Sequence, residues 1–162
     1  HGPAGMITLS HIKNYDEKIS ATLVEIFDHQ YKYTENINEP SLFFQNRADI
    51  KITPSNETKM IAGYPCKKLN VHYRNENNRE ITYAIYHTDQ ITIKDFTQNT
   101  PYQSINGVLL EFQIEIYQIP MKLEAVEVKK KDIPSEEFEI PDGYKMVNKK
   151  TMKEIIEVLK ER

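Results

Sequence analysis

The nine residues VLLEFQIEI, Val108–Ile116, carry the longest alternation of apolar and polar side chains in the chain. Every second residue from position 108 onward is apolar, and Glu111, Gln113 and Glu115 stand between them. Successive side chains of a strand point to opposite faces, so this pattern predicts a strand with one buried face and one wet face. We therefore expect a mainly β protein built on an antiparallel sheet.

The neighbouring segments extend this sheet. Ile119–Pro120 indicates a turn, and Met121–Val128 then alternates again as a partner strand. Upstream, Lys68–Arg74 and Glu80–His87 also alternate, and the four polar residues Asn75–Asn78 between them favour a tight turn. The sequence therefore predicts two consecutive β-hairpins.

Weaker patterns predict further extended segments in both halves of the chain. Alternation at period two or a high Tyr content marks most of them, and turn residues separate them. The polar stretch 54–59 contains Pro54 and is expected to be a loop. The further segments expected are strands at Ile7–Ile12, Ile19–Phe27 and Gln30–Glu35, an edge strand at Ala48–Thr53, a turn at Asn14–Glu17 and an extended segment at Phe138–Met146.

The C-terminal segment differs from the rest, because its apolar residues recur at helical spacing. A helix at 149–161 is predicted, capped by Asn148 or Thr151, with Glu154 at capping-box spacing from Thr151. We expect this helix to pack on a curved antiparallel sheet, in one α+β domain at 6–162. His1–Gly5 is typical of an expression-tag remnant. The apolar positions of the helix are Met152, Ile155, Ile156 and Leu159.

Composition excludes some functions. The chain has 21 Lys and Arg against 24 Asp and Glu, for a net charge of −3, and its basic residues are dispersed. A nucleic-acid partner would require clustered positive charge, so none is expected. No apolar run is long enough for a transmembrane helix. Any export signal could have been removed with the native N-terminus, so the missing signal says nothing about location.

The residue types of known catalytic sites do not form a convincing pattern here. Cys66 follows Pro65 at the start of a predicted strand, where a small buried apolar residue is the usual explanation. His72 and His87 lie on the two arms of one predicted hairpin, and if they met they would make a workable metal site together with a carboxylate. A register error of one residue would place them on opposite faces, so a pair of surface histidines is favoured. We expect no enzyme activity, no catalytic residue, no cofactor and no metal.

Three segments resemble the envelope family called domain of unknown function 4412, which occurs in Bacteroidetes. They are KMIAGYPCKK at Lys59–Lys68, NGVLLE at Asn106–Glu111 and FEIPDGYK at Phe138–Lys145. The resemblance covers roughly Lys59 to Val147 in matching order and spacing. NGVLLE also looks like a degenerate form of the signature of the neighbouring GLPGLI family.

The resemblance implies an exported protein of the periplasm, outer membrane or cell surface, often a lipoprotein. It implies a fold similar to the lipoprotein carrier LolA, an open half-barrel whose concave apolar face is covered by helices. The family has no established catalytic residues. We therefore expect a lipid or other apolar ligand on the concave face at Phe112, Ile114 and Leu123. The alternative is a structural or interaction module that docks an envelope protein or a second copy of itself.

Overall fold

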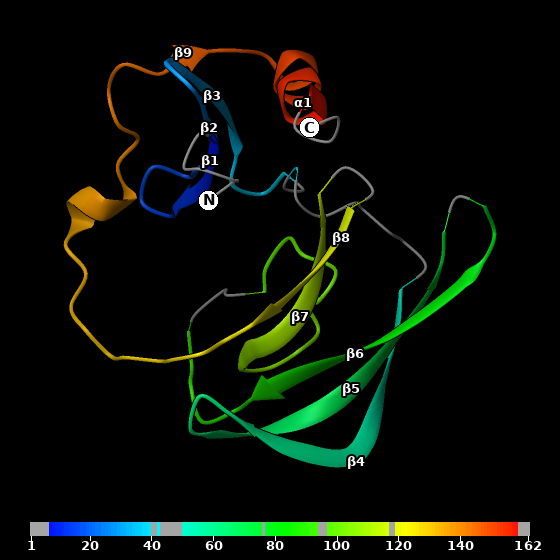
Figure 1. Ribbon diagram of the computed structural model, residues 1–162. Helices are drawn as coiled ribbons and strands as arrows, with labels where there is room; N and C mark the ends of the chain where they lie inside the picture. Colours follow the sequence, from blue (N-terminus) through cyan, green and yellow to red (C-terminus); the bar gives the residue numbers. More distant parts are fainter. Residues whose placement is uncertain are drawn as a thin grey trace. The chain divides into compact units, whose positions relative to one another are not determined.

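The computed structural model describes residues 7–39, 42, 50–75, 77–93, 97–116 and 119–158. The described chain is mainly β, with two sheets, a short C-terminal helix and no closed barrel (Figure 1). It divides into two compact units, which are described separately. One contains His1–Glu39 and Lys131–Arg162, and the other contains Pro40–Lys130.

The smaller sheet has the order β1-β2-β3-β9. Strands β1, β2 and β3 run antiparallel, and the two-residue β9 pairs in parallel with β3. The predicted first turn is confirmed, since Asn14 Oδ1 accepts hydrogen bonds from the amides of Asp16 at 3.1 Å and Glu17 at 3.0 Å. The strands are β1 Ile7–Asn14, β2 Ile19–Ile26, β3 His29–Asn36 and β9 Lys145–Met146.

The C-terminal helix α1, Lys149–Val158, belongs to the same unit as the smaller sheet. Asn148 Oδ1 accepts from the Thr151 amide at 2.9 Å, so Asn148 is the residue that caps the helix. Met152 and Ile156, one turn apart, are buried. The helix packs against β3 of the four-stranded sheet, whereas we expected it on the sheet that contains the long alternating strand. A one-turn 3₁₀ helix, η2 Ser135–Phe138, ends at the first residue of the expected extended segment Phe138–Met146.

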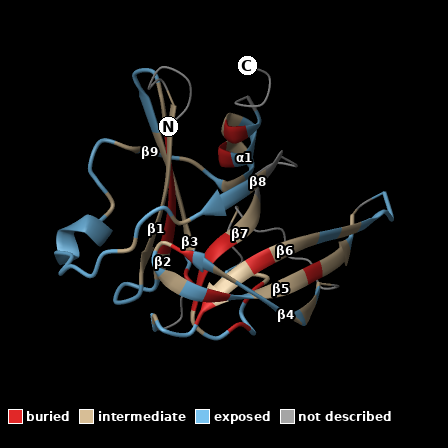
Figure 2. Ribbon diagram, turned by 60° about the horizontal axis from the view of Figure 1, so that its bottom comes forward, coloured by how far each residue is buried: buried red, intermediate tan, exposed pale blue. Residues whose placement is uncertain are grey.

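The larger sheet is antiparallel throughout, with the order β4-β5-β6-β7-β8. The Asn-rich turn is confirmed, because Asn75 Oδ1 accepts from the Asn77 and Arg79 amides between β5 and β6. Buried positions cluster where β5, β6 and β7 run together (Figure 2). The strands are β4 Lys51–Ile61, β5 Tyr64–Arg74, β6 Glu80–Thr88, β7 Val108–Ile116 and β8 Ile119–Glu124.

Further sequence expectations differ from this fold. The strands expected in one sheet are divided between two, because alternation shows that a segment is a strand but not which strand it joins. The stretch 54–59, expected as a loop, belongs to β4. This strand is at the sheet edge, where a proline such as Pro54 is tolerated, and so is the register shift between Pro54 and Thr58. Strand β8 begins at Ile119, so Ile119–Pro120, expected as a turn, belongs to the strand, and β8 ends at Glu124, before the expected Val128.

The strand with the longest alternation contains a β-bulge. Tyr86 of β6 pairs with Glu111 and the next residue, His87, pairs with Leu109, so Leu110 is the extra residue. The bulge moves Phe112 off the face that alternation assigns to Val108 and Leu110. Phe112 packs against one buried cluster, that of Val71, Ile85, Tyr102, Ile105 and Leu109. Val108 and Leu110 belong to a second cluster, with Ile61 and Cys66.

Candidate functional site

The three residues expected to bind an apolar ligand lie on one face of the β7–β8 hairpin. Phe112 pairs with Leu123, and the next rung on that face pairs Ile114 with Met121. Phe112 and Ile114 are partly buried, and Leu123 is 40% exposed. The structure therefore brings Phe112, Ile114 and Leu123 together in an apolar surface at the sheet edge, which we call the β7–β8 apolar surface.

The part of this face toward β5 and β6 is filled by the chain itself. Tyr102 and Ile105, from the segment between β6 and β7, are buried against it. The Tyr102 hydroxyl donates to the Gln113 carbonyl at 2.6 Å and accepts from the Tyr83 hydroxyl at 2.9 Å. Burial raises the pKa of Tyr102 well above its usual range, so the phenol stays protonated. Leu123, toward the edge strand, remains exposed on this face.

The opposite face of the same hairpin carries a buried carboxylate, which sequence reasoning missed. The Glu111 side chain is 5% exposed and accepts hydrogen bonds from Lys59 of β4 and from Lys122 of β8, the latter at 2.8 Å. Lys59 Nζ also lies 4.4 Å from the Tyr86 ring centroid. Burial raises the pKa of Glu111, but the hydrogen bonds and charges of the two lysines outweigh it and lower the pKa. The ion pairs of Glu111 with Lys59 and Lys122 therefore link strand β7 to β4 and to β8.

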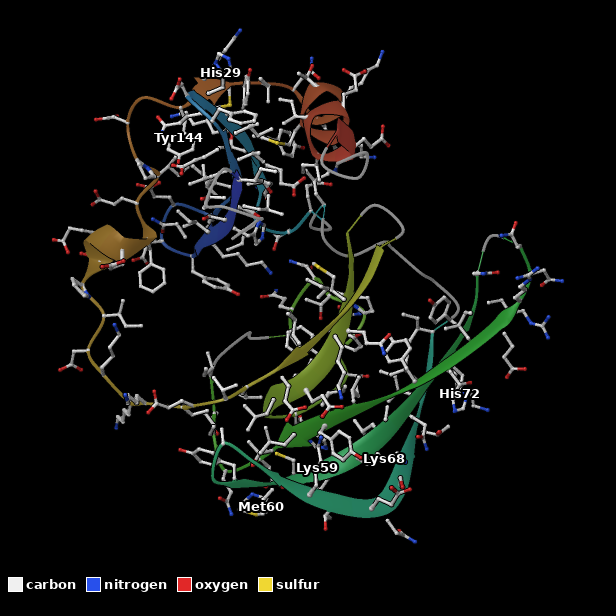
Figure 3. All side chains as sticks on the ribbon, in the orientation of Figure 1. His29, Lys59, Met60, Lys68, His72 and Tyr144 are labelled. Atoms are coloured by element: carbon white, nitrogen blue, oxygen red, sulfur yellow. The ribbon has the colours of Figure 1, made fainter. Side chains whose placement is uncertain are left out.

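The histidines of the predicted hairpin do not meet. His72 pairs in register with Thr82, whereas His87 pairs with Lys67, so the two rings are on opposite faces and five residues apart along β5. His72 Nε2 lies 3.2 Å from Thr53 Oγ1 and its Nδ1 lies 3.0 Å from Thr82 Oγ1. Figure 3 shows His72 farther along β5 than Lys68. Across the described ranges, no group of three or more His, Cys, Asp or Glu is placed to hold a metal ion.

Cys66 lies in the core of the larger unit. It is fully buried, and its thiol donates to the Tyr64 carbonyl at 3.4 Å. Burial raises the pKa of the thiol, which keeps it protonated and unreactive. This agrees with the interpretation of Cys66 as a small buried apolar residue.

The smaller sheet has a polar cluster that sequence reasoning did not identify. The ring of His11 in β1 lies between two hydroxyl groups. Its Nε2 is 3.3 Å from Ser20 Oγ and its Nδ1 is 3.3 Å from Thr22 Oγ1, and both Ser20 and Thr22 are buried. Burial, with a smaller contribution from the charge of Lys13, lowers the pKa of His11 to about 4. His11 is therefore neutral at physiological pH and exchanges hydrogen bonds with β2.

Glu35 of β3 is the second member of this polar cluster. Its side chain is 4% exposed, and Oε2 accepts from the Tyr33 hydroxyl at 3.0 Å and from Lys149 Nζ of α1 at 3.2 Å. Since 114 residues separate Glu35 from Lys149, no local sequence pattern could indicate their pairing.

Comparison with known proteins identifies no relative. No family model, no curated protein and no solved structure matches this chain. The resemblance drawn from the three sequence segments therefore stays an expectation. Within the described residues, no helix has the length and apolar character to cross a membrane.

Proposed function

We propose that this protein is a non-enzymatic binding protein of the bacterial envelope that takes a lipid acyl chain or other apolar ligand. The observation that supports the binding role is the β7–β8 apolar surface, where Phe112, Ile114 and Leu123 share one face and Leu123 is 40% exposed. The location in the periplasm or at the cell surface rests on the sequence resemblance alone. So does a LolA-like half-barrel for the five-stranded sheet.

The physical basis is removal of apolar surface from water. Each methylene group that a ligand buries contributes about 0.8 kcal/mol. The opposite face of the hairpin carries Glu111, Lys122 and Glu124, so the two faces of β7–β8 differ sharply in polarity. An acyl chain on the Leu123 side meets side chains that need no hydrogen-bond partner. The ligand's polar head group would stay in solvent at the sheet edge.

Fluorescence titration with a polarity-sensitive fatty acid tests this function. We expect saturable enhancement with the wild-type protein and a loss of roughly tenfold or more in affinity for Leu123→Glu, because a carboxylate would have to be desolvated. Ile133→Glu is the matched control. Ile133 is also a half-exposed aliphatic residue, at 50%, and lies outside the larger unit. Equal affinities for all three proteins, or no saturable binding, would contradict the proposal.

The second candidate is a docking module for an envelope protein or for a second copy of the chain. The observation in its favour is that β8 is an edge strand of the described sheet, and that Val126 just beyond it is 94% exposed. Edge strands and exposed apolar residues are common features of protein interfaces. Sedimentation velocity over a range of concentrations distinguishes the two candidates. A self-associating species that Val126→Glu returns to monomer supports docking, and a monomer at every concentration contradicts its homodimer form.

A further inference from the structure

The face of the smaller sheet that carries Tyr33 and Glu35 is polar at one end, whereas its other end carries Leu9 and Val24 and is apolar, as is usual for a sheet face beneath a helix. Direct cross-strand partners share a face, and two adjacent rungs of β1, β2 and β3 contain only polar side chains. Burying such groups costs free energy unless hydrogen bonds compensate. Polar residues at core positions therefore call for an explanation other than packing. The two rungs are His11–Thr22–Tyr33 and Lys13–Ser20–Glu35.

One acceptor in this cluster is left without a donor. Glu35 Oε2 receives the Tyr33 hydroxyl and the Lys149 ammonium, but Oε1 is buried and has no hydrogen-bond partner. An ionised carboxylate has room for about four hydrogen bonds, and a buried acceptor without a donor is costly. The orphan oxygen indicates a site that accepts a further N–H or O–H group.

The Lys149 ammonium shows which chemistry this site accepts. It lies 3.2 Å from Glu35 Oε2 and 6.0 Å from the Tyr33 ring centroid, so a carboxylate and an aromatic face bind one cation. Burial, the hydrogen bond to Glu35 and the nearby charges of Glu35 and Glu39 together raise the pKa of Tyr33 to about 12. Glu35 and Glu39 thus both place negative charge near Tyr33.

The position of Lys149 suggests that it can be displaced. It is the first residue of α1, and a cation in the first turn opposes the helix dipole, so Glu35 rather than the helix accounts for its placement. Its side chain is 43% exposed, which gives the ammonium group access to solvent, whereas Glu35 is enclosed. An external cation could therefore reach Glu35 where Lys149 enters.

We propose that Glu35 and Tyr33 form a binding site for the alkylammonium group of a small-molecule ligand, and that Lys149 occupies this site as an internal competitor. The incoming ammonium takes the place of Nζ on Oε2 and donates a further hydrogen bond to Oε1. The neutral His11 and its hydroxyl partners Ser20 and Thr22 line the sheet face next to this site. This site is independent of the β7–β8 apolar surface, since it lies in the other unit.

Titration with n-butylammonium chloride tests the proposal, because this cation reproduces the end of a lysine side chain. Amide chemical shifts of β3 and α1 report binding in the full chain. Sodium chloride at equal ionic strength and the neutral n-butanol are the ligand controls. The variants are Lys149→Ala, which removes the competitor, and Lys150→Ala as its matched control. Lys150 is the adjacent lysine, 87% exposed, and its ion pair is with Glu154 on the helix surface.

We expect saturable shifts with n-butylammonium and none with n-butanol. The affinity of Lys149→Ala should exceed that of the wild type by roughly five- to thirtyfold, the range expected from loss of a partly buried ion pair. Lys150→Ala should match the wild type, and adding Glu35→Gln to Lys149→Ala should abolish binding. Should the double variant unfold, Tyr33→Phe, which keeps the ring and removes one donor to Glu35, must still bind the cation. An unchanged affinity in Lys149→Ala, or equal responses to n-butanol, would overturn the proposal.

Discussion

Glu111→Gln keeps the shape of a buried side chain in the larger unit and removes its charge. Glu111 is 5% exposed and accepts from Lys59 and Lys122, whose side chains are 35% and 54% exposed. Hydrogen bonds to ionised groups contribute about 1.5–3 kcal/mol each, but solvent screens these lysines and desolvation of the carboxylate offsets part of the gain. We expect the free energy of unfolding to fall by about 1–2 kcal/mol, which lowers the urea midpoint by roughly 0.5–1 M.

The pH dependence gives this prediction a second readout. The folded pKa of Glu111 is lowered from an ordinary value near 4.5, so the unfolded chain binds the proton more readily. The contribution of Glu111 is therefore fully present above the unfolded pKa and is lost as the pH falls through the lower folded pKa. In urea denaturation, the midpoint of wild type should exceed that of Glu111→Gln at pH 7, and this difference should disappear in acid.

The control is Glu124→Gln. Glu124 is 50% exposed and lies 3.9 Å from Lys59 Nζ and 3.7 Å from Lys122 Nζ, so it faces the same lysines from solvent. Its substitution should leave the midpoint nearly unchanged. Two results would refute the role of Glu111 as a buried carboxylate that links β4, β7 and β8 through its ion pairs. One is an equal urea midpoint for wild type and Glu111→Gln at pH 7, and the other is a midpoint difference that persists unchanged in acid.

Three further predictions concern the fold. Tyr102→Phe removes the hydroxyl that donates to the Gln113 carbonyl and should cost about 1–2 kcal/mol in thermal denaturation, where an unchanged Tm would argue against that hydrogen bond. Gly107→Ala would make Cβ clash with the Thr88 carbonyl oxygen of β6 at φ +87, so we expect the free energy of unfolding to fall by about 2–3 kcal/mol. Gly63→Ala, at φ +84 with nothing within 4 Å, should cost less in the same urea titration. Brief trypsin treatment should cut first at 129–131, an exposed lysine run between the two units, as intact mass spectrometry of the fragments will show.

Elements with strong periodicity are predictable from the sequence. The hairpin β5–β6, the strands β1 and β2 and the C-terminal helix appear close to their expected bounds, because a half-buried strand or helix repeats its apolar residues at a fixed period. Strand β4 lacks that signal. It is an edge strand with mostly exposed or partly exposed residues, so its polar sequence looks like that of a loop. The function expected from the resemblance stays a prediction.

The candidate sites were predictable only in part. Phe112, Ile114 and Leu123 share a face as expected, but the bulge at Leu110 changes which core Phe112 joins. A bulge inserts one residue into the pairing without disturbing the local apolar pattern, so alternation does not show it. Whether His72 and His87 could approach each other depended on strand register, and the register places them apart.

The stretch from Val108 to Ile116 shows what each level of structure determined. Its alternation by itself determined a strand in an antiparallel sheet, because side-chain direction along a strand is a local property of the backbone. Only the tertiary structure decided that Glu111 within it lies buried between Lys59 and Lys122, and that Glu35 meets Lys149 in the other unit. Those contacts depend on which strands and helices become neighbours. Lys59 and Glu111 are 52 residues apart and Glu35 and Lys149 are 114 apart, so no short segment of sequence contains a pattern that predicts either pair.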